Sequence, residues 1–172
     1  MQFYNITDSY ITYLKTFDNT VSDNKVMSRP YVGIVLEINE VKYFAPFSSP
    51  KPKHQRMKNG KDFRKINGGI YGAINLNNMI PVVDNALIKI DINNLVDVQY
   101  KRLLQNQYNC IRSDKIQIQN VATKLHALIF TDDANLTAQD LKVKQRCCNL
   151  PVLETASKSY RQYLDFGLGL SQ

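Results

Sequence analysis

The stretch RPYVGIVLEINEVKYFAPFSSPK, residues 29–51, decides the fold. It contains two runs rich in β-branched and aromatic residues, YVGIVLEI and VKYFAPF, which are separated by Asn39 and Glu40. Two such runs joined by two residues predict a β-hairpin. Arg29 precedes the first arm and the segment SSPK, residues 48–51, follows the second. The two ends of the stretch should therefore meet at the open end of the hairpin.

The residues around the hairpin extend a β-rich first half. QFYNI, residues 2–6, predicts a first strand. Apolar residues at positions 10, 11, 14 and 17 have the spacing of an amphipathic helix, which Thr7 or Asp8 would cap. Residues 18–28 are polar and predict a loop. Three short apolar runs within GGIYGAINLNNMIPVVDNALIKIDI predict further antiparallel strands.

From about residue 97 the pattern becomes helical. One stripe of the first predicted helix consists of Tyr100, Leu103, Leu104, Tyr108 and Ile111. A second helix should begin at Ser113 and run to about Phe130. A third should follow Thr137, with Asp140 at capping-box spacing, and a last one should begin at Pro151. The sequence therefore predicts an α+β fold, a single compact domain over residues 1–172 with an antiparallel sheet surrounded by helices.

Composition limits the class of protein. The chain has 172 residues, enough for a substantial core, and it contains neither a signal-peptide pattern nor an apolar window long enough to cross a bilayer. Cys110, Cys147 and Cys148 make a poor disulfide framework and suit a reducing cytosol. A vicinal disulfide at 147–148 is conceivable, but two thiols at the end of a helix fit better. Three cysteines and two separated histidines form no usual zinc spacing, so we expect neither a metal nor another cofactor.

The positive charge of the chain is concentrated in residues 51–65. This segment has one acid, Asp62, and seven cations, a surplus of +6 in a chain whose net charge is +7. The cations are Lys51, Lys53, Arg56, Lys58, Lys61, Arg64 and Lys65. Because the rest of the chain is nearly neutral and the segment leaves a strand end, this charge indicates a mobile loop that neutralises nucleic-acid phosphates. The alternative is a solvated loop that only maintains solubility.

Residues at the start of this segment suit phosphate chemistry. Ser48 and Ser49 can hold a phosphate oxygen, and Lys51 can stabilise the charge that builds up on a phosphorane. The alternative reading of SSPK is a simple turn. Arg29 should approach Ser48 and Lys51 across the hairpin and can bind a phosphate through two hydrogen bonds. Alternatively, it is a surface residue where a strand begins.

Histidine and tyrosine supply further candidates. His54 lies in the basic segment and could donate a proton, whereas His126 lies on a predicted helix and should be a packed or surface residue. A cooperating pair of these histidines is therefore disfavoured. Among the ten tyrosines, Tyr31 is the first candidate for stacking on an unpaired base, although most should be half-buried in strands and helices.

Five blocks of the sequence, in this order, resemble the ToxN/AbiQ family, the protein toxins of type III toxin–antitoxin systems. The blocks are FYNITDSYITYLKTFDNTV, SRPYVGIVLEINEVKYFAPFSSPK, INLNNMIPV, QYKRLLQNQYNCIRSDKI and CCNLPVLETASKSY. The resemblance implies a strongly twisted antiparallel sheet akin to the Kid and MazF toxins. It also implies a metal-independent endoribonuclease of the bacterial cytoplasm that arrests growth in defence against phage. A small, pseudoknot-like antitoxin RNA from a repeated array would hold it inactive in a closed protein–RNA assembly.

The resemblance also implies roles for particular residues. The hydroxyl pair of the family falls on Ser48 and Ser49, its lysine on Lys51 and its basic residue before the first long strand on Arg29. Some relatives have threonine first in the hydroxyl pair, and some place a functional tyrosine in the loop before the basic residue, where this chain has SDNKVMS. The implied reaction is attack by the 2′-hydroxyl of the RNA, which leaves a 2′,3′-cyclic phosphate and a 5′-hydroxyl.

In this reaction Lys51 would stabilise negative charge, Ser49 would hold the scissile phosphate, and Ser48 and Arg29 would support them. The other expected RNA contacts are Tyr31, Lys53, His54, Arg56, Lys58, Lys61, Arg64 and Lys65. Two alternatives stay open from the sequence. One is an RNA-binding protein without catalysis that uses the same basic segment. The other is a protein-interaction domain whose cations meet an acidic partner.

Overall fold

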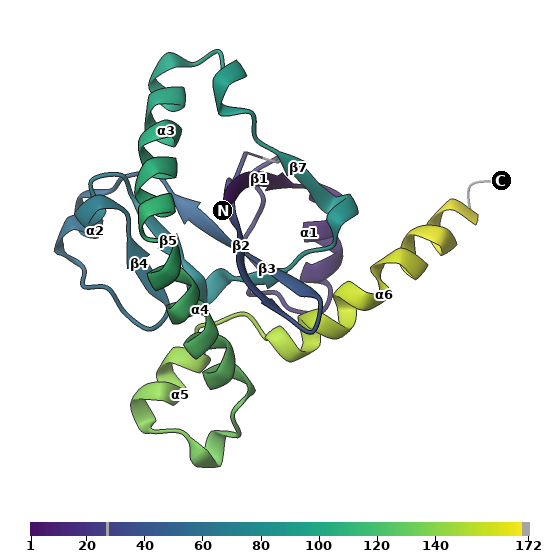
Figure 1. Cartoon of the computed structure of the whole chain (residues 1–172). Coiled ribbons are helices and arrows are strands. Elements are labelled where there is room, and N and C mark those ends of the chain that lie inside the picture. Colours follow the sequence, from purple (N-terminus) through teal and green to yellow (C-terminus); the bar gives the residue numbers. More distant parts are fainter. Residues whose placement is uncertain (27, 170–172) are drawn as a thin grey trace.

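The computed structural model describes residues 1–26 and 28–169, which form an antiparallel sheet with helices packed around it (Figure 1). Its strands are β1 Gln2–Ile6, β2 Tyr31–Ile38, β3 Val41–Ser48, β4 Phe63–Lys65, β5 Ala73–Asn75, β6 Ile80–Pro81 and β7 Leu87–Lys89. Its α-helices are α1 Asp8–Lys15, α2 Pro52–Arg56, α3 Val98–Ser113, α4 Lys115–Phe130, α5 Ala138–Lys144 and α6 Leu150–Gly169. Short 3-10 helices are η1 Asn67–Gly69, η2 Leu76–Asn78, η3 Asp84–Ala86, η4 Ile92–Asn94 and η5 Asp133–Asn135. The architecture is α+β, as the sequence predicts.

Strand β3 is the central connection of the sheet. The strands follow the order β4–β5–β3–β2–β1–β7, with β6 pairing to β3 off this path. Every pairing is antiparallel. Along its second edge β3 pairs first with β6, through Tyr43 and Phe44, and then with β5, through Phe47 and Ser48. The last residues of β3 therefore lie where the small β4–β5 extension joins the main sheet.

The predicted hairpin is confirmed, including its turn. β2 and β3 pair from Ile38↔Val41 to Tyr31↔Pro46, and Asn39 and Glu40 form the connection. Both turn residues have positive φ, 48° and 66°. A two-residue turn with positive φ at both positions matches the right-handed twist of the strands it joins. The turn thus sets the register next to the bend, and the irregularity between Val32 and Leu36 shifts it so that Tyr31 meets Pro46.

Gly33 allows an aromatic ring to lie across β2. A Cβ built on Gly33 would lie 2.0 Å from Cε1 of Phe44, so the ring occupies the space that any side chain there would need. Phe44 is 1% exposed, and its ring meets that of Tyr4 edge-on with centroids 5.4 Å apart. The hairpin register between Val32 and Leu36 is irregular at this point. The missing side chain is therefore a packing requirement of the hairpin.

Tyrosines join the helices to the sheet. α6 packs against α1 and β6, and α4 packs against β2. The hydroxyl of Tyr10 donates to the carbonyl oxygen of Pro81 at 2.9 Å, and that of Tyr13 donates to Ala156 at 3.0 Å. The rings of Tyr10 and Tyr160 meet edge-on at 4.7 Å. Each phenol buries its ring and satisfies its polar end, which is the usual condition for burying tyrosine.

Several elements differ from expectation. The basic segment contains α2 and β4 and is not one loop. Ser113 ends α3 instead of capping the next helix, because its Oγ donates to the carbonyl of Asn109 at 3.0 Å within the last turn. α6 begins one residue before Pro151. All three cysteines are free thiols, so the pair at 147–148 forms no vicinal disulfide. Of the helices in the described ranges, none combines the length and apolar character needed to cross a bilayer.

The contact between Gly33 and Phe44 yields a stability prediction. The substitution Gly33→Ala should lower the free energy of unfolding by about 1–3 kcal/mol, the usual cost of overpacking a core. Gly60→Ala is the matched control, since its Cβ would come no closer than 3.4 Å to Asp62 Oδ1. Urea denaturation of both variants measures the difference. Equal midpoints for Gly33→Ala and the parent would show that the hairpin tolerates a side chain at this position.

Candidate active site

The end of β3 positions the two serines differently. Ser48 pairs with Ala73 of β5, and its Oγ lies 3.4 Å from the carbonyl oxygen of Ala73. Gly72, with φ of 91°, passes so close that a Cβ there would lie 1.9 Å from the carbonyl oxygen of Ser48. Ser49 has left the sheet and is exposed. Strand β5 therefore holds Ser48 in place, and the hydroxyl of Ser49 faces solvent.

Lys51 projects from the first position before α2. Its backbone is extended, Pro52 starts the helix, and the backbone N–H of His54 donates to the carbonyl oxygen of Lys51 at 2.9 Å. The side chain of Lys51 is exposed. Helix α2 packs against η1, where the absence of a Cβ on Gly69 lets the two backbones touch. Helix α2 is thus anchored to the rest of the protein, and it fixes the position from which the flexible side chain of Lys51 extends.

Arg29 reaches the same end of the sheet from β2. The backbone N–H of Phe47 donates to the carbonyl oxygen of Pro30 at 3.1 Å, so Arg29 is level with the end of β3. Its Nε donates to the carbonyl oxygen of Asp23 at 2.6 Å. That bond occupies one donor of the guanidinium and leaves the others for a ligand. The expected approach of Arg29 to the end of β3 therefore has a basis in the strand register.

Two expected RNA contacts are wrong in this structure. Tyr31 is 1% exposed, because β1 and β3 flank it on both sides, so its ring has no face available for a base. His54 is 2% exposed, and its ring packs near Phe63 with centroids 5.9 Å apart. Burial, together with the charges of Lys51 and Lys53, lowers the pKa of His54. This histidine holds α2 against the sheet and does not reach the surface.

His126 has no part in the site. It is half-buried on α4, stacks on Phe130 with centroids 4.3 Å apart, and shares a hydrogen bond with the hydroxyl of Tyr43 at 3.1 Å. Glu154 lies 3.4 Å from the same ring nitrogen. The two histidines thus contact different residues. Within residues 1–26 and 28–169, no group of three or more His, Cys, Asp or Glu side chains could hold a metal ion.

The charges of the basic segment divide into two groups. Arg64 forms two hydrogen bonds with the carboxylate of Asp114, one of them at 2.7 Å, and its side chain is only 18% exposed. Lys61 pairs with Asp140 on α5, and Asp62 accepts from Arg146. These pairs attach the β4 edge to the helical half of the chain. Arg64 and Lys61 therefore share their charges with acids of this chain.

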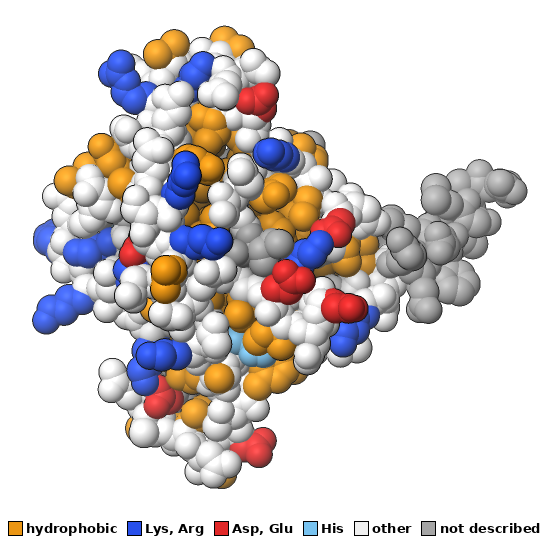
Figure 2. Space-filling view, viewed as in Figure 1, with side chains coloured by type: hydrophobic (Ala, Val, Ile, Leu, Met, Phe, Trp, Pro, Cys, Tyr) orange, Lys and Arg blue, Asp and Glu red, His pale blue; other side chains and the backbone are white. Residues whose placement is uncertain are grey.

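The second group of cations is free to meet a ligand. It consists of Lys51, Lys53, Arg56 and Lys58, all exposed and, within the described chain, without an acid at ion-pair distance. Lys65 is half-buried, with its Nζ 3.4 Å from the carbonyl oxygen of Gln55. Figure 2 shows Lys and Arg side chains gathered along the edge where α2 lies. We call the four exposed residues the α2 cations.

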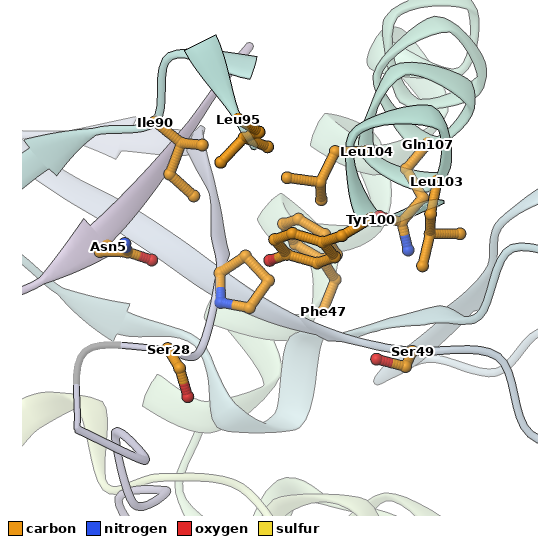
Figure 3. A pocket seen from close by; sticks show the side chains of 11 residues that line it. Asn5, Ser28, Phe47, Ser49, Ile90, Leu95, Tyr100, Leu103, Leu104 and Gln107 are labelled. Atoms are coloured by element: carbon orange, nitrogen blue, oxygen red, sulfur yellow. The ribbon is translucent and has the colours of Figure 1, made fainter. Parts of the chain in front are cut away.

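A cavity of about 370 Å³ opens beside Ser49 (Figure 3). Strand β1, the residues just before β2, the end of β3, the segment between β7 and α3, and helix α3 itself contribute to its wall. The residues that line it are Asn5, Ser28, Pro30, Phe47, Ser49, Ile90, Leu95, Tyr100, Leu103, Leu104 and Gln107. An apolar wall with a few convergent polar groups is typical of a small-ligand site. Its place beside Ser49 joins it to the candidate phosphate site.

The sequence signals of this cavity were present but ambiguous. Tyr100 belongs to the stripe that predicts the buried face of α3, and burial raises its pKa. Gln107 lies seven residues after Tyr100 and three after Leu104, so it is a polar residue on an apolar face. The position of Gln107 on an apolar face was the one sequence feature that could have pointed to the cavity. Asn5, in the first strand, carried none.

The fold and site together define a small basic protein in which a sheet edge presents hydroxyls, a lysine and an arginine beside a ligand-sized cavity. This is a class of site suited to binding, and reacting at, phosphate groups. Residues 2–158 match the family described as Toxin ToxN, type III toxin-antitoxin system. The chain belongs to this family, which confirms the resemblance seen in the sequence.

Individual relatives cover nearly the whole chain. An endoribonuclease ToxN of Pectobacterium atrosepticum is 33% identical over 177 residues, which cover 97% of this chain and 94% of the relative. A solved structure concerned with selective toxin inhibition by a non-coding RNA pseudoknot gives a TM-score of 0.82 at 29% identity, covering 93% of this chain and 97% of that one. AbiQ, a lactococcal anti-phage endoribonuclease of a type III system, gives 0.77 at 25% identity, covering 94% and 98%.

The burial of His54 leads to a pH prediction. The folded protein binds a proton at His54 only at a pH below the ordinary pKa of 6.5, whereas the unfolded chain binds it near 6.5. The free energy of unfolding should therefore fall as the pH drops through 6.5 and level off below the folded pKa. His54→Phe, which keeps a ring against Phe63, should remove this part of the pH dependence. Urea titrations at about pH 7 and pH 5 measure it; identical pH dependence in parent and variant would contradict the assignment.

Proposed function

We propose that this protein is an endoribonuclease toxin of a type III toxin–antitoxin system, held inactive by a small antitoxin RNA. The observation that carries the proposal is the arrangement at the end of β3, where exposed Ser49 lines a cavity and the α2 cations begin two residues later at Lys51. Family membership and the names of the relatives support it. RNA fits this arrangement because the α2 cations can neutralise its backbone phosphates, Ser49 and Lys51 can donate hydrogen bonds to the reacting phosphate, and the cavity can hold a base.

The proposed chemistry uses the RNA as its own nucleophile. The 2′-oxygen forms a bond to phosphorus while the bond from phosphorus to the next 5′-oxygen breaks. One proton leaves the 2′-hydroxyl and one is added to the departing 5′-oxygen. The products are a 2′,3′-cyclic phosphate and a 5′-hydroxyl. This reaction needs orientation and charge stabilisation, which side chains supply without a metal ion.

Each residue at the sheet edge has a role in this proposal. Lys51, at the end of a flexible stem on an anchored helix, stabilises the added negative charge on the phosphate. Ser49 donates to a non-bridging phosphate oxygen. Ser48 fixes the direction of the edge through β5, and Arg29 uses the donors that Asp23 leaves free. The α2 cations follow the RNA backbone on either side of the cut.

The same surface would serve the inhibitor. An antitoxin RNA with a pseudoknot-like fold, made from a repeated precursor, would occupy the cavity beside Ser49 and the surface of the α2 cations in a closed protein–RNA assembly. The solved structure concerned with selective toxin inhibition by a non-coding RNA pseudoknot supports this part of the proposal. Free toxin would cut cellular or phage RNA in the bacterial cytoplasm and arrest growth, a role supported by the anti-phage relative. We further propose that residues 1–172 act as one domain and that the sheet shares its strong twist with the Kid and MazF toxins.

Removal of the reacting groups should separate cleavage from binding. Ser49→Ala and Lys51→Ala should each lower the rate of RNA cleavage roughly 10²–10³-fold, the usual effect of losing one transition-state donor. Binding to antitoxin RNA should fall less than tenfold, because the remaining α2 cations stay in place. Ser113→Ala and Lys142→Ala, both at exposed helix positions, are controls. Variants that cleave at the parent rate would overturn the assignment. RNA binding without cleavage by the parent would favour the alternative of a non-catalytic RNA-binding protein.

The division of the basic segment predicts different salt dependences. On single-stranded RNA each neutralised phosphate contributes about 0.7 to the slope of log affinity against log salt. Lys53→Ala should therefore reduce the slope by about 0.7. Lys61→Ala, the control, should reduce it less, since Asp140 already shares that charge. Filter binding across a salt series measures both slopes. Equal reductions would contradict the division, and affinity for an acidic protein without affinity for RNA would favour a protein-interaction domain.

A further inference from the structure

The cavity beside Ser49 contains polar groups that the protein leaves without partners. Gln107 is 1% exposed and lines the cavity from α3. Its Nε2 donates to the carbonyl oxygen of Tyr71 at 2.7 Å, while its Oε1 is buried and accepts no hydrogen bond from the described chain. A buried acceptor without a donor costs free energy that a bound donor can recover. The cavity thus has a built-in place for an N–H group.

Other polar groups on the same wall are also available. Among the hydrogen bonds of the side chains that the structure describes (residues 1–26, 28–33 and 35–160), none engages the amide of Asn5, the hydroxyl of Ser49 or the hydroxyl of Tyr100. Figure 3 shows the ring of Tyr100 extending from α3 across the cavity, with Ser49 on the side away from Leu95. A flat ring, two amides and a hydroxyl around one apolar space suit a planar ligand with a polar edge. A nucleobase has this chemistry.

We propose that this cavity binds the base of one of the two nucleotides joined at the scissile phosphate, and that Gln107 selects adenine or cytosine through the amino group at C6 of adenine or C4 of cytosine. The inference rests on the proposed function, because it takes Ser49 as the residue that holds this phosphate. Tyr100 offers its ring for stacking on the base. Gln107 is a specificity-determining residue, since it touches the base and not the reacting atoms.

The selection follows from the fixed orientation of the Gln107 amide. The carbonyl of Tyr71 occupies the Nε2 donor, so the oxygen of the amide is the group left without a partner. Adenine and cytosine carry an amino donor where guanine and uracil carry a carbonyl. An amino group would satisfy Oε1, whereas a carbonyl would face it with a second acceptor. Oε1 is closed to solvent without a ligand, so the base reaches it by displacing side chains at the cavity wall.

The test uses the purified full-length protein and short RNAs that vary at the two nucleotides flanking one cleavage site. The parent should cleave RNAs with adenine or cytosine at one of these positions roughly tenfold or more faster than those with guanine or uracil, the effect of one good base contact. Gln107→Leu should bring that ratio close to one. Gln99→Leu, an exposed position on the same helix, should leave the ratio unchanged.

A substrate change tests the same contact without altering the protein. Purine in place of adenine, or pyrimidin-2-one in place of cytosine, removes only the amino group and should slow cleavage by the parent roughly tenfold or more. This measurement decides the matter if Gln107→Leu fails to fold. Equal cleavage of all four bases at both positions, or an unchanged preference in Gln107→Leu, would overturn the base subsite alone. A parent that cleaves no RNA would overturn the proposed function and this inference together.

Discussion

The register of the β2–β3 hairpin determines where the candidate site residues lie. The two-residue turn at Asn39 and Glu40 pairs Ile38 with Val41, and the register shift between Val32 and Leu36 then brings Pro30 opposite Phe47. Arg29 and Ser48 consequently lie at one end of the sheet although they are far apart along the chain. Phe44, lying over Gly33, keeps the hairpin in this register. The site therefore depends on how the two strands of the hairpin pack together.

The balance of charge has a physical logic of its own. Seven cations in fifteen residues would repel each other if all were free, yet Arg64 and Lys61 are neutralised by Asp114 and Asp140. Those pairs attach the β4 edge to α4 and α5, while the α2 cations stay exposed. The basic segment is already folded and its α2 cations are exposed. Less of the chain must therefore be ordered when RNA binds, which lowers the free-energy cost of binding. The basic segment is thus partly scaffold and partly binding surface.

The features that the sequence predicts well are those set by local signals. Two β-rich runs around Asn39 and Glu40 predict the hairpin. The spacing between Thr137 and Asp140 predicts the helix cap, in which the side chain of Thr137 accepts a hydrogen bond from the N–H of Asp140. The sequence did not predict that the basic segment is folded, because its structure is stabilised by ion pairs such as Arg64–Asp114 that join distant parts of the chain. The burial of Tyr31 depends on β1, a partner that no local pattern names. The cavity with Gln107 needs α3 to fold back over the sheet, which only the tertiary structure reveals.

The central claim is that the edge formed by Ser48 to Lys51 lets the ribose of RNA break its own chain. The most direct measurement is end-group analysis of RNA cut by the purified protein, stripped of bound RNA and kept in excess chelator. The account predicts cleavage that leaves 2′,3′-cyclic phosphate and 5′-hydroxyl ends. Cleavage that requires added magnesium and leaves 3′-hydroxyl and 5′-phosphate ends, or no cleavage of any RNA, would contradict it.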